Sequence, residues 1–208
     1  MISDDDAPGW AALEAAFAAP TGGAEPQHFG TAALPGQGGL YGLNAYAVDT
    51  HWLLLGLGLS DLFGSTPSGG GLLGRLRGRR GGTSGHGLEL TLRVPRDPAD
   101  TAPPSWALTL LQQLSAYVAS SGRPLAPGHR MNPGGPITGE PSTRLTGLVF
   151  AADPQVPVVD TPTGRVDVVA VVGVTAEELA SAQQGPDASQ VVAALAATDP
   201  LLITDPRR

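Results

Sequence analysis

The chain contains no cysteine and no lysine, and only 5% of its residues are aromatic. Without cysteine, disulfide bonds, zinc–thiolate sites and thiol nucleophiles are excluded. The N-terminus has no basic region followed by an apolar run, so no signal peptide is predicted. The longest apolar stretch, residues 52–59, is too short to cross a bilayer. These absences lead us to expect a soluble cytoplasmic protein without a membrane partner.

The acidic charge is distributed unevenly along the 208 residues. The net charge is −7, yet residues 64–87 contain four arginines and no acidic residue, which leaves −11 on the rest of the chain. A body of this charge repels nucleic acid and attracts basic proteins, mainly by raising the association rate. Solubility alone is the other explanation of the charge.

Strand and helix patterns are both present, in separate blocks. Residues 88–94 alternate between apolar side chains and Glu89, Thr91 and Arg93, which predicts a half-buried strand. Apolar residues then recur at helical spacing from Trp106 to Val118, with Ser105 as the expected N-cap. We read residues 40–48, 52–59, 145–151, 156–159, 166–174 and 201–204 as further strands. A short helix is read between Pro8 and Pro20, a second is read as starting at the capping box of Thr175, and a third covers residues 187–197. This order predicts an α+β fold with a mixed, mainly antiparallel sheet packed by a few helices.

The glycine-rich segment at about residues 65–86 is expected to be a flexible loop within a single domain of residues 1–208. It contains glycines 69, 71 and 74 at the spacing of a dinucleotide-binding fingerprint, but no convincing strand precedes them and no helix follows. The arginines between Arg75 and Arg80 offer an alternative function, contact with nucleic-acid phosphates. A solvated loop on an acidic protein explains them more simply.

Catalytic and metal-binding motifs are missing. The four histidines show no ligand spacing, and neither a nucleophile elbow nor a phosphate-binding loop occurs. We therefore predict no cofactor and no metal. One enzymatic alternative stays open, a hydrolase that uses histidine and carboxylate side chains of the loop at residues 123–141, which contains His129.

Several sequence blocks, taken in order, resemble the suppressor of fused domain family. The resemblance covers roughly residues 9–208, and the succession of the blocks is more specific than any one of them. The blocks are 51–52 with 58–64, 84–93, 102–106 with 117–118, 153–154, 161–164, 172–179 with 181–184, and 202–205.

The resemblance implies an α+β fold and a non-enzymatic, protein-binding role. Animal members clamp a peptide of a Gli-type transcription factor between two lobes, and this chain resembles their N-terminal half. Their groove tyrosine matches Tyr117, whereas the aspartate before their loop histidine is Gly128 here, next to His129. Stand-alone bacterial members are thought to be immunity proteins that neutralise a toxin of the same cell.

Three residues are the candidate partner contacts. Tyr117 and His129 follow from the resemblance, and Asp61 is added as a polar residue that could equally be a turn former. Tyr117 could equally be the last buried ring of its helix. Trp10, Trp52 and Trp106 are expected in the core because their neighbours are apolar. The expected partner is a protein, and a basic toxin suits the acidic body.

Overall fold

A computed structural model describes residues 7–30, 40–64 and 82–208. The predicted separate blocks of strands and helices are present, and most elements lie within a few residues of their expected positions. In chain order the elements are α1 (Pro8–Phe17), β1 (Gln27–Gly30), β2 (Gly42–Ala47), β3 (His51–Leu57), β4 (Thr83–Pro95), α3 (Ser105–Ser121), β5 (Arg130–Met131), β6 (Leu145–Ala152), β7 (Val158–Thr161), β8 (Gly164–Thr175), α4 (Ala176–Gln184) and α5 (Ser189–Thr198).

All eight strands form one sheet in the order β1-β2-β3-β4-β8-β6-β5, with β7 paired to β8 outside this path. Every pairing is antiparallel except that of β4 with β8, which is parallel. The α+β prediction is therefore confirmed. Because β5 comes last in the order, its outer edge has no neighbouring strand in the described part of the chain.

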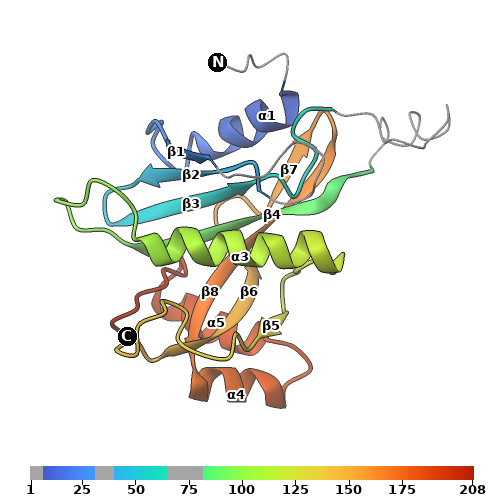
Figure 1. Ribbon diagram of the computed structural model, residues 1–208. Coiled ribbons are helices and arrows are strands. Elements are labelled where there is room, and N and C mark those ends of the chain that lie inside the picture. The colour runs from blue at the N-terminus through green and yellow to red at the C-terminus, as the bar shows by residue number, and fades with distance from the viewer. Residues whose placement is uncertain (1–6, 31–39, 65–81) are drawn as a thin grey trace.

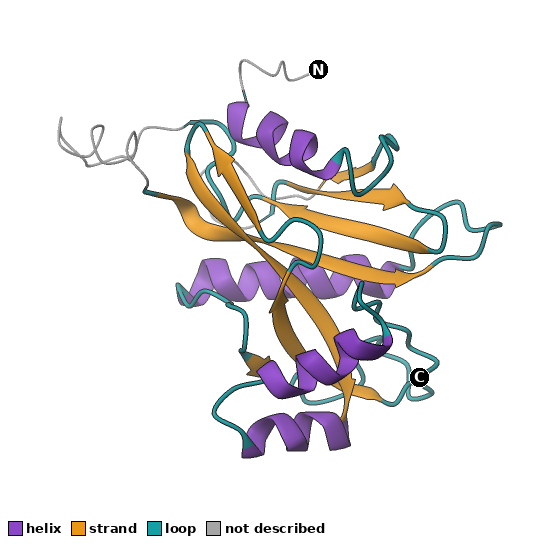
Figure 2. Ribbon diagram, turned by 180° about the vertical axis from the view of Figure 1, so that it is seen from behind, coloured by secondary structure: helices purple, strands orange, loops and turns teal. Residues whose placement is uncertain are grey.

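Helices cover both faces of the sheet. The long helix α3 crosses one face, where its buried residues join side chains of β2, β3, β4, β6 and β8 in one core cluster (Figure 1). On the other face, α1 packs over the end formed by β2 and β3, and α4 and α5 pack over β6 and β8 (Figure 2). The strands at the centre of the sheet are consequently buried on both sides.

Local sequence signals account for the helix ends. The capping box predicted at Thr175 is confirmed: its hydroxyl accepts from the Glu178 N–H at 3.2 Å, and the Glu178 carboxylate accepts from the Thr175 N–H at 2.8 Å. Helix α3 ends where Gly122 adopts a left-handed conformation with φ of 66°. The prediction for its start was wrong, because Pro104 is the N-cap and Ser105 is already helical.

The prediction that β4 is only half-buried was also wrong. Glu89, Thr91 and Arg93 alternate with apolar residues as expected, but all three are at most 2% exposed. The alternation identifies two faces of a strand without telling which face water reaches. Since β4 lies at the centre of the sheet, its polar face is covered by the turn after β3, which donates to Glu89, and by the loop before β7, which pairs with Arg93.

The C-terminal segment fills a gap between two strands instead of forming the strand predicted at residues 201–204. Strands β4 and β8 are paired only as far as Thr91 and Ala170. Beyond that point the Thr204 N–H donates to the Arg93 carbonyl at 2.8 Å, and the Thr204 hydroxyl accepts from the Gly173 N–H at 3.0 Å. One residue thus bridges both strand ends without ladder pairing.

Most of the predicted loop at about residues 65–86 lies outside the described residues, and strand β4 begins at Thr83. The fingerprint glycines and the arginines from 75 to 80 lie outside the described residues. Of the three tryptophans, Trp52 is confirmed as core with 1% exposure, whereas Trp10 and Trp106 are only partly buried at the edges of the core clusters.

Candidate functional site

A buried ion pair is the strongest electrostatic feature of the described structure. The guanidinium of Arg93 meets both carboxylate oxygens of Asp153, at 2.7 and 3.1 Å, and also donates to the Gln155 side-chain oxygen at 2.9 Å. The Thr91 hydroxyl donates to Asp153 at 2.7 Å. Burial would raise the pKa of Asp153, but the hydrogen bonds and charge of Arg93 outweigh it and hold that pKa below its usual value. This cluster joins β4 to the loop before β7, away from solvent, so its role is structural.

Glu89 is a second buried acid with a different environment. Its Oε1 accepts hydrogen bonds from the Gly58 N–H, the Ser60 N–H and the Ser60 hydroxyl at 2.7 to 2.9 Å. Its Oε2 is buried without a hydrogen-bond partner among the described residues. Burial has the largest influence and raises the pKa of Glu89 to about 7, although the hydrogen bonds to Oε1 act to lower this pKa. Glu89 thus fixes the turn that follows β3.

The side chain of Tyr117 is exposed on α3. It is 39% exposed, and no other large hydrophobic side chain in residues 7–30, 40–64 and 82–208 is as exposed. Its neighbours Leu114 and Val118 are buried against the sheet, so the helix backbone beneath it is fixed. An exposed aromatic ring on a rigid helix loses little entropy when a partner covers it.

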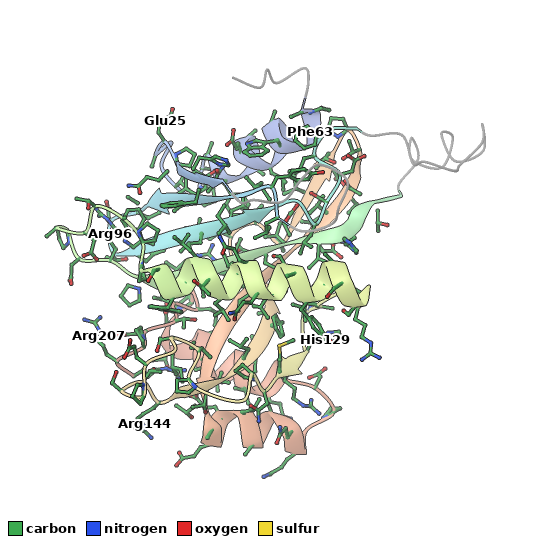
Figure 3. The ribbon with its side chains drawn as sticks, viewed as in Figure 1. Glu25, Phe63, Arg96, His129, Arg144 and Arg207 are labelled. Atoms are coloured by element: carbon green, nitrogen blue, oxygen red, sulfur yellow. The ribbon has the colours of Figure 1, made fainter. Side chains whose placement is uncertain are left out.

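His129 lies beyond the C-terminal end of α3, directly before the edge strand β5 (Figure 3). Its side chain is exposed, and its Nδ1 accepts a hydrogen bond from the Ala126 N–H at 3.3 Å. Its carbonyl accepts from the Phe150 N–H at 3.0 Å, which attaches the turn to β6. Tyr117 and His129 therefore flank the loop that leads from α3 to the open edge of β5.

A carboxylate from another element lies beside Gly128. The Ala188 N–H donates to the Gly128 carbonyl at 2.8 Å, and a methyl group built on Gly128 would be 3.4 Å from Oδ2 of Asp187. Hydrogen bonds from Ser189 lower the pKa of Asp187, so this acid is ionised at neutral pH. Sequence reasoning missed Asp187, because only the fold brings the start of α5 to this turn.

Asp61, the third candidate partner contact, lies away from Tyr117 and His129. Its backbone N–H donates to the Ser84 hydroxyl at 2.9 Å, its carbonyl accepts from the Thr163 hydroxyl at 2.7 Å, and its carboxylate accepts from the Phe63 N–H. Phe63 lies beside α1, at the end of the molecule far from His129 (Figure 3). The structure thus brings Tyr117 and His129 to the same end of α3 and leaves Asp61 in a turn on the other side of the sheet.

Comparison with known proteins identifies the family. A family model described as suppressor of fused protein matches residues 41–208. The chain belongs to the suppressor of fused family. The suppressor of fused homologs of Homo sapiens and Mus musculus are each 36% identical to it over 166 residues, which is 77% of this chain and 32% of theirs. The chain therefore spans about a third of the length of these relatives.

Solved structures show the same fold. A crystal structure of a Sufu–Fu complex superposes with a TM-score of 0.82 at 28% identity, covering 98% of this chain and 91% of the other. Drosophila suppressor of fused gives a TM-score of 0.81 at 26% identity and covers 99% of this chain but 51% of its own. A suppressor of fused homolog from Neisseria gonorrhoeae shares the fold, with a TM-score of 0.60 at 11% identity over 96% of this chain and 94% of its own.

The other functions considered for this suppressor of fused domain gain no support. In the described ranges His129 makes no hydrogen bond to a carboxylate that could orient it as a general base, and no three potential metal ligands cluster. The arginines proposed to contact nucleic acid lie outside those ranges. None of the helices that the structure describes is long and apolar enough to span a membrane.

Proposed function

We propose that this chain is a non-enzymatic protein-binding domain whose partner docks over Tyr117 and along the open edge of β5. The observation that carries the proposal is the exposure of Tyr117 near the C-terminal end of the rigid helix α3, from which residues 122–129 lead to the edge strand β5. Tyrosine is enriched among the residues that dominate binding energies at protein interfaces. An unpaired strand edge can accept an extended segment of a partner as an additional strand. His129 and Asp187 would supply polar contacts at the rim of this surface.

The partner that fits this domain best is a basic protein, and we propose a toxin that the chain neutralises as an immunity protein. The three aspartates and four arginines outside the described residues contribute +1 to the whole-chain charge of −7, so the described residues carry −8. Opposed charges raise the association rate and suppress wrong partners. The Sufu–Fu complex supports the general role, since a relative of similar fold is found there with a protein partner.

Capture of the partner from the native cell lysate tests this function. The wild-type chain is immobilised, the bound proteins are identified by mass spectrometry, and the genes beside its own are read. We expect one basic protein that is encoded nearby, is toxic when expressed alone and is tolerated when this chain is co-expressed. A captured protein whose toxicity is unchanged by co-expression would rule out the immunity role and leave only a binding role.

The effect of Tyr117→Ala on this capture tests the docking surface. We expect binding to weaken by about 30-fold or more, because a central tyrosine contributes about 2 kcal/mol or more. The variant should melt as the wild type does, since the ring is substantially exposed. The matched control is Gln112→Ala, an exposed residue of α3 that lies about 140° around the helix from Tyr117. Equal binding of both variants and the wild type would exclude Tyr117 from the interface.

A further inference from the structure

The turn after β3 is a short segment with a glycine at each end. Residues 58–64, here called the lid, begin and end at glycines with positive φ, 137° at Gly58 and 66° at Gly64. Residues with a side chain rarely adopt such angles, and glycine lets the backbone change direction at both points. Between them, Leu59 and Leu62 are each 1% exposed and pack into different core clusters. The lid is thus a small plug of the core held between two hinge positions.

Glu89 is the point on the sheet to which the lid is fastened. Its Oε1 accepts three hydrogen bonds, from the Gly58 N–H and from the N–H and the hydroxyl of Ser60. Glu89 is 0% exposed, and its Oε2 has no hydrogen-bond partner among the described residues. A neutral acid in this position leaves one O–H unpaired, whereas an ionised one leaves part of a full charge without water, which costs far more. The closed lid therefore opposes ionisation of Glu89, and an open lid would permit it.

The Glu89 carboxyl has no cation within 4.0 Å among the described residues. Its neighbour across the pairing of β4 with β8 is the apolar Val168. The charged and titratable side chains on the surrounding elements are exposed or bonded to other groups; they are Glu14 on α1, His51 on β3, Asp61 in the lid, His86 and Arg93 on β4, Asp153 before β7, Asp160 on β7, and Arg165 and Asp167 on β8. The largest influences on the pKa of Glu89 are burial, which raises it, and the hydrogen bonds of the lid, which lower it.

The closed lid also anchors two neighbouring elements. The Gly9 N–H at the start of α1 donates to the Leu62 carbonyl at 3.0 Å, and the His86 N–H on β4 donates to the Leu59 carbonyl at 2.7 Å. A methyl group built on Gly9 would lie 2.5 Å from the Asp61 carbonyl oxygen, so α1 and the lid touch backbone to backbone. Movement of the lid would therefore break the bond that holds the start of α1.

We propose that Glu89 and the lid form a pH-dependent conformational switch, in which the lid is closed over protonated Glu89 and opens locally far more often once Glu89 ionises. Water then reaches Oε2 while the eight-stranded sheet stays folded. Because the pKa of Glu89 is raised from 4.5 to about 7 in the closed state, closure is favoured most below about pH 4.5 and this preference is lost as the pH rises through about 7. Opening removes Leu62 from its core cluster and frees the start of α1, without involving the Tyr117 surface.

Hydrogen exchange followed by NMR tests the switch at single amides. The reporters are the N–H groups that the closed lid holds in hydrogen bonds, those of Gly9, Gly58, Ser60 and His86. After correction for intrinsic exchange rates, their protection should fall at least about tenfold from pH 5.5 to pH 8 in the wild type and stay constant in Glu89→Gln. Because a local opening exposes little surface, their exchange should barely respond to urea up to about 1 M.

Leu54, in the middle of β3 between β2 and β4, is the reference for global unfolding, and its exchange should respond steeply to urea. Lid amides that follow Leu54 in both pH and urea dependence would overturn the proposal, because Glu89 would then act on the whole fold. A fall in protection that persists in Glu89→Gln would overturn it as well.

Gly64→Ala tests the hinge separately from the acid. A methyl group built there has no described atom closer than 3.7 Å, so only the φ of 66° opposes alanine in the closed lid. The lid amides should exchange about fivefold faster than in the wild type at every pH, with the same pH dependence. Gly122→Ala is the matched control, because Gly122 has the same φ at the end of α3 and no described atom within 4 Å of a built methyl group. Equal exchange of the lid amides in both variants would overturn the hinged lid.

Discussion

Replacing Asp153 with alanine is expected to lower the free energy of unfolding by about 3–5 kcal/mol, because it leaves the guanidinium of Arg93 buried without its counter-charge. The side chains of this pair are 1% and 0% exposed, so water cannot reach Arg93 without opening the structure. The change also removes the acceptor of the N–H groups of Gln155 and Val156. For a chain of this size the loss corresponds to a fall in melting temperature of roughly 10 °C.

Urea unfolding of the Asp153→Ala variant measures this loss. The matched control is Asp205→Ala, which removes an aspartate paired with the exposed Arg207 and should change stability little, because solvent screens that pair. A variant of Asp153 as stable as the control would mean that the Arg93 pair is not buried as described.

The second large effect is a dependence of stability on pH that originates at Glu89. Its pKa of about 7 in the folded chain lies above the ordinary value of 4.5, so the folded state binds the proton more tightly than the unfolded state does. The resulting stabilisation is complete below about pH 4.5 and is lost as the pH rises through about 7. The full difference amounts to about 3 kcal/mol.

Glu89→Gln isolates this contribution, since the amide oxygen can keep the hydrogen bonds from Gly58 and Ser60 but does not ionise. Between pH 5 and pH 8 the stability of the wild type should fall relative to the variant by about 2–3 kcal/mol. Unfolding curves at several pH values measure the difference, with the exposed Glu140→Gln as control. A constant gap between wild type and Glu89→Gln across this range would show that Glu89 is not a buried, neutralised acid.

The sequence predicted most elements because their signals are local. The capping box at Thr175 and the apolar spacing within α3 both depend on neighbours a few residues apart. The polar face of β4 was misassigned for the opposite reason. Alternation describes β4 alone, whereas the burial of Glu89 and Arg93 depends on distant segments that cover the strand.

The candidate site residues also divide into those that local sequence signals identify and those that only the fold brings together. Tyr117 and His129 could be named from the sequence through the family resemblance, but spacing alone left Tyr117 as either core or contact. Asp187 could not be found, because it meets Gly128 only after the fold has brought the segment before α5 to the turn at Gly128. A cavity of about 390 Å³ beside Trp106 is lined by three separated chain segments, residues 50, 94–106 and 205–207, and no local pattern links Thr50 to Arg207.

Hydrogen–deuterium exchange with and without the captured partner tests the proposed docking surface most directly. The proposal predicts that amide protection gained on binding is concentrated at the C-terminal half of α3, the turn at His129 and strand β5. An exposed strand edge exchanges readily, so pairing with a partner strand should strongly slow exchange of the one outward-facing amide of the two-residue strand β5. Protection confined to α4 and α5, or to the turn at Asp61, would contradict the docking of a partner at Tyr117.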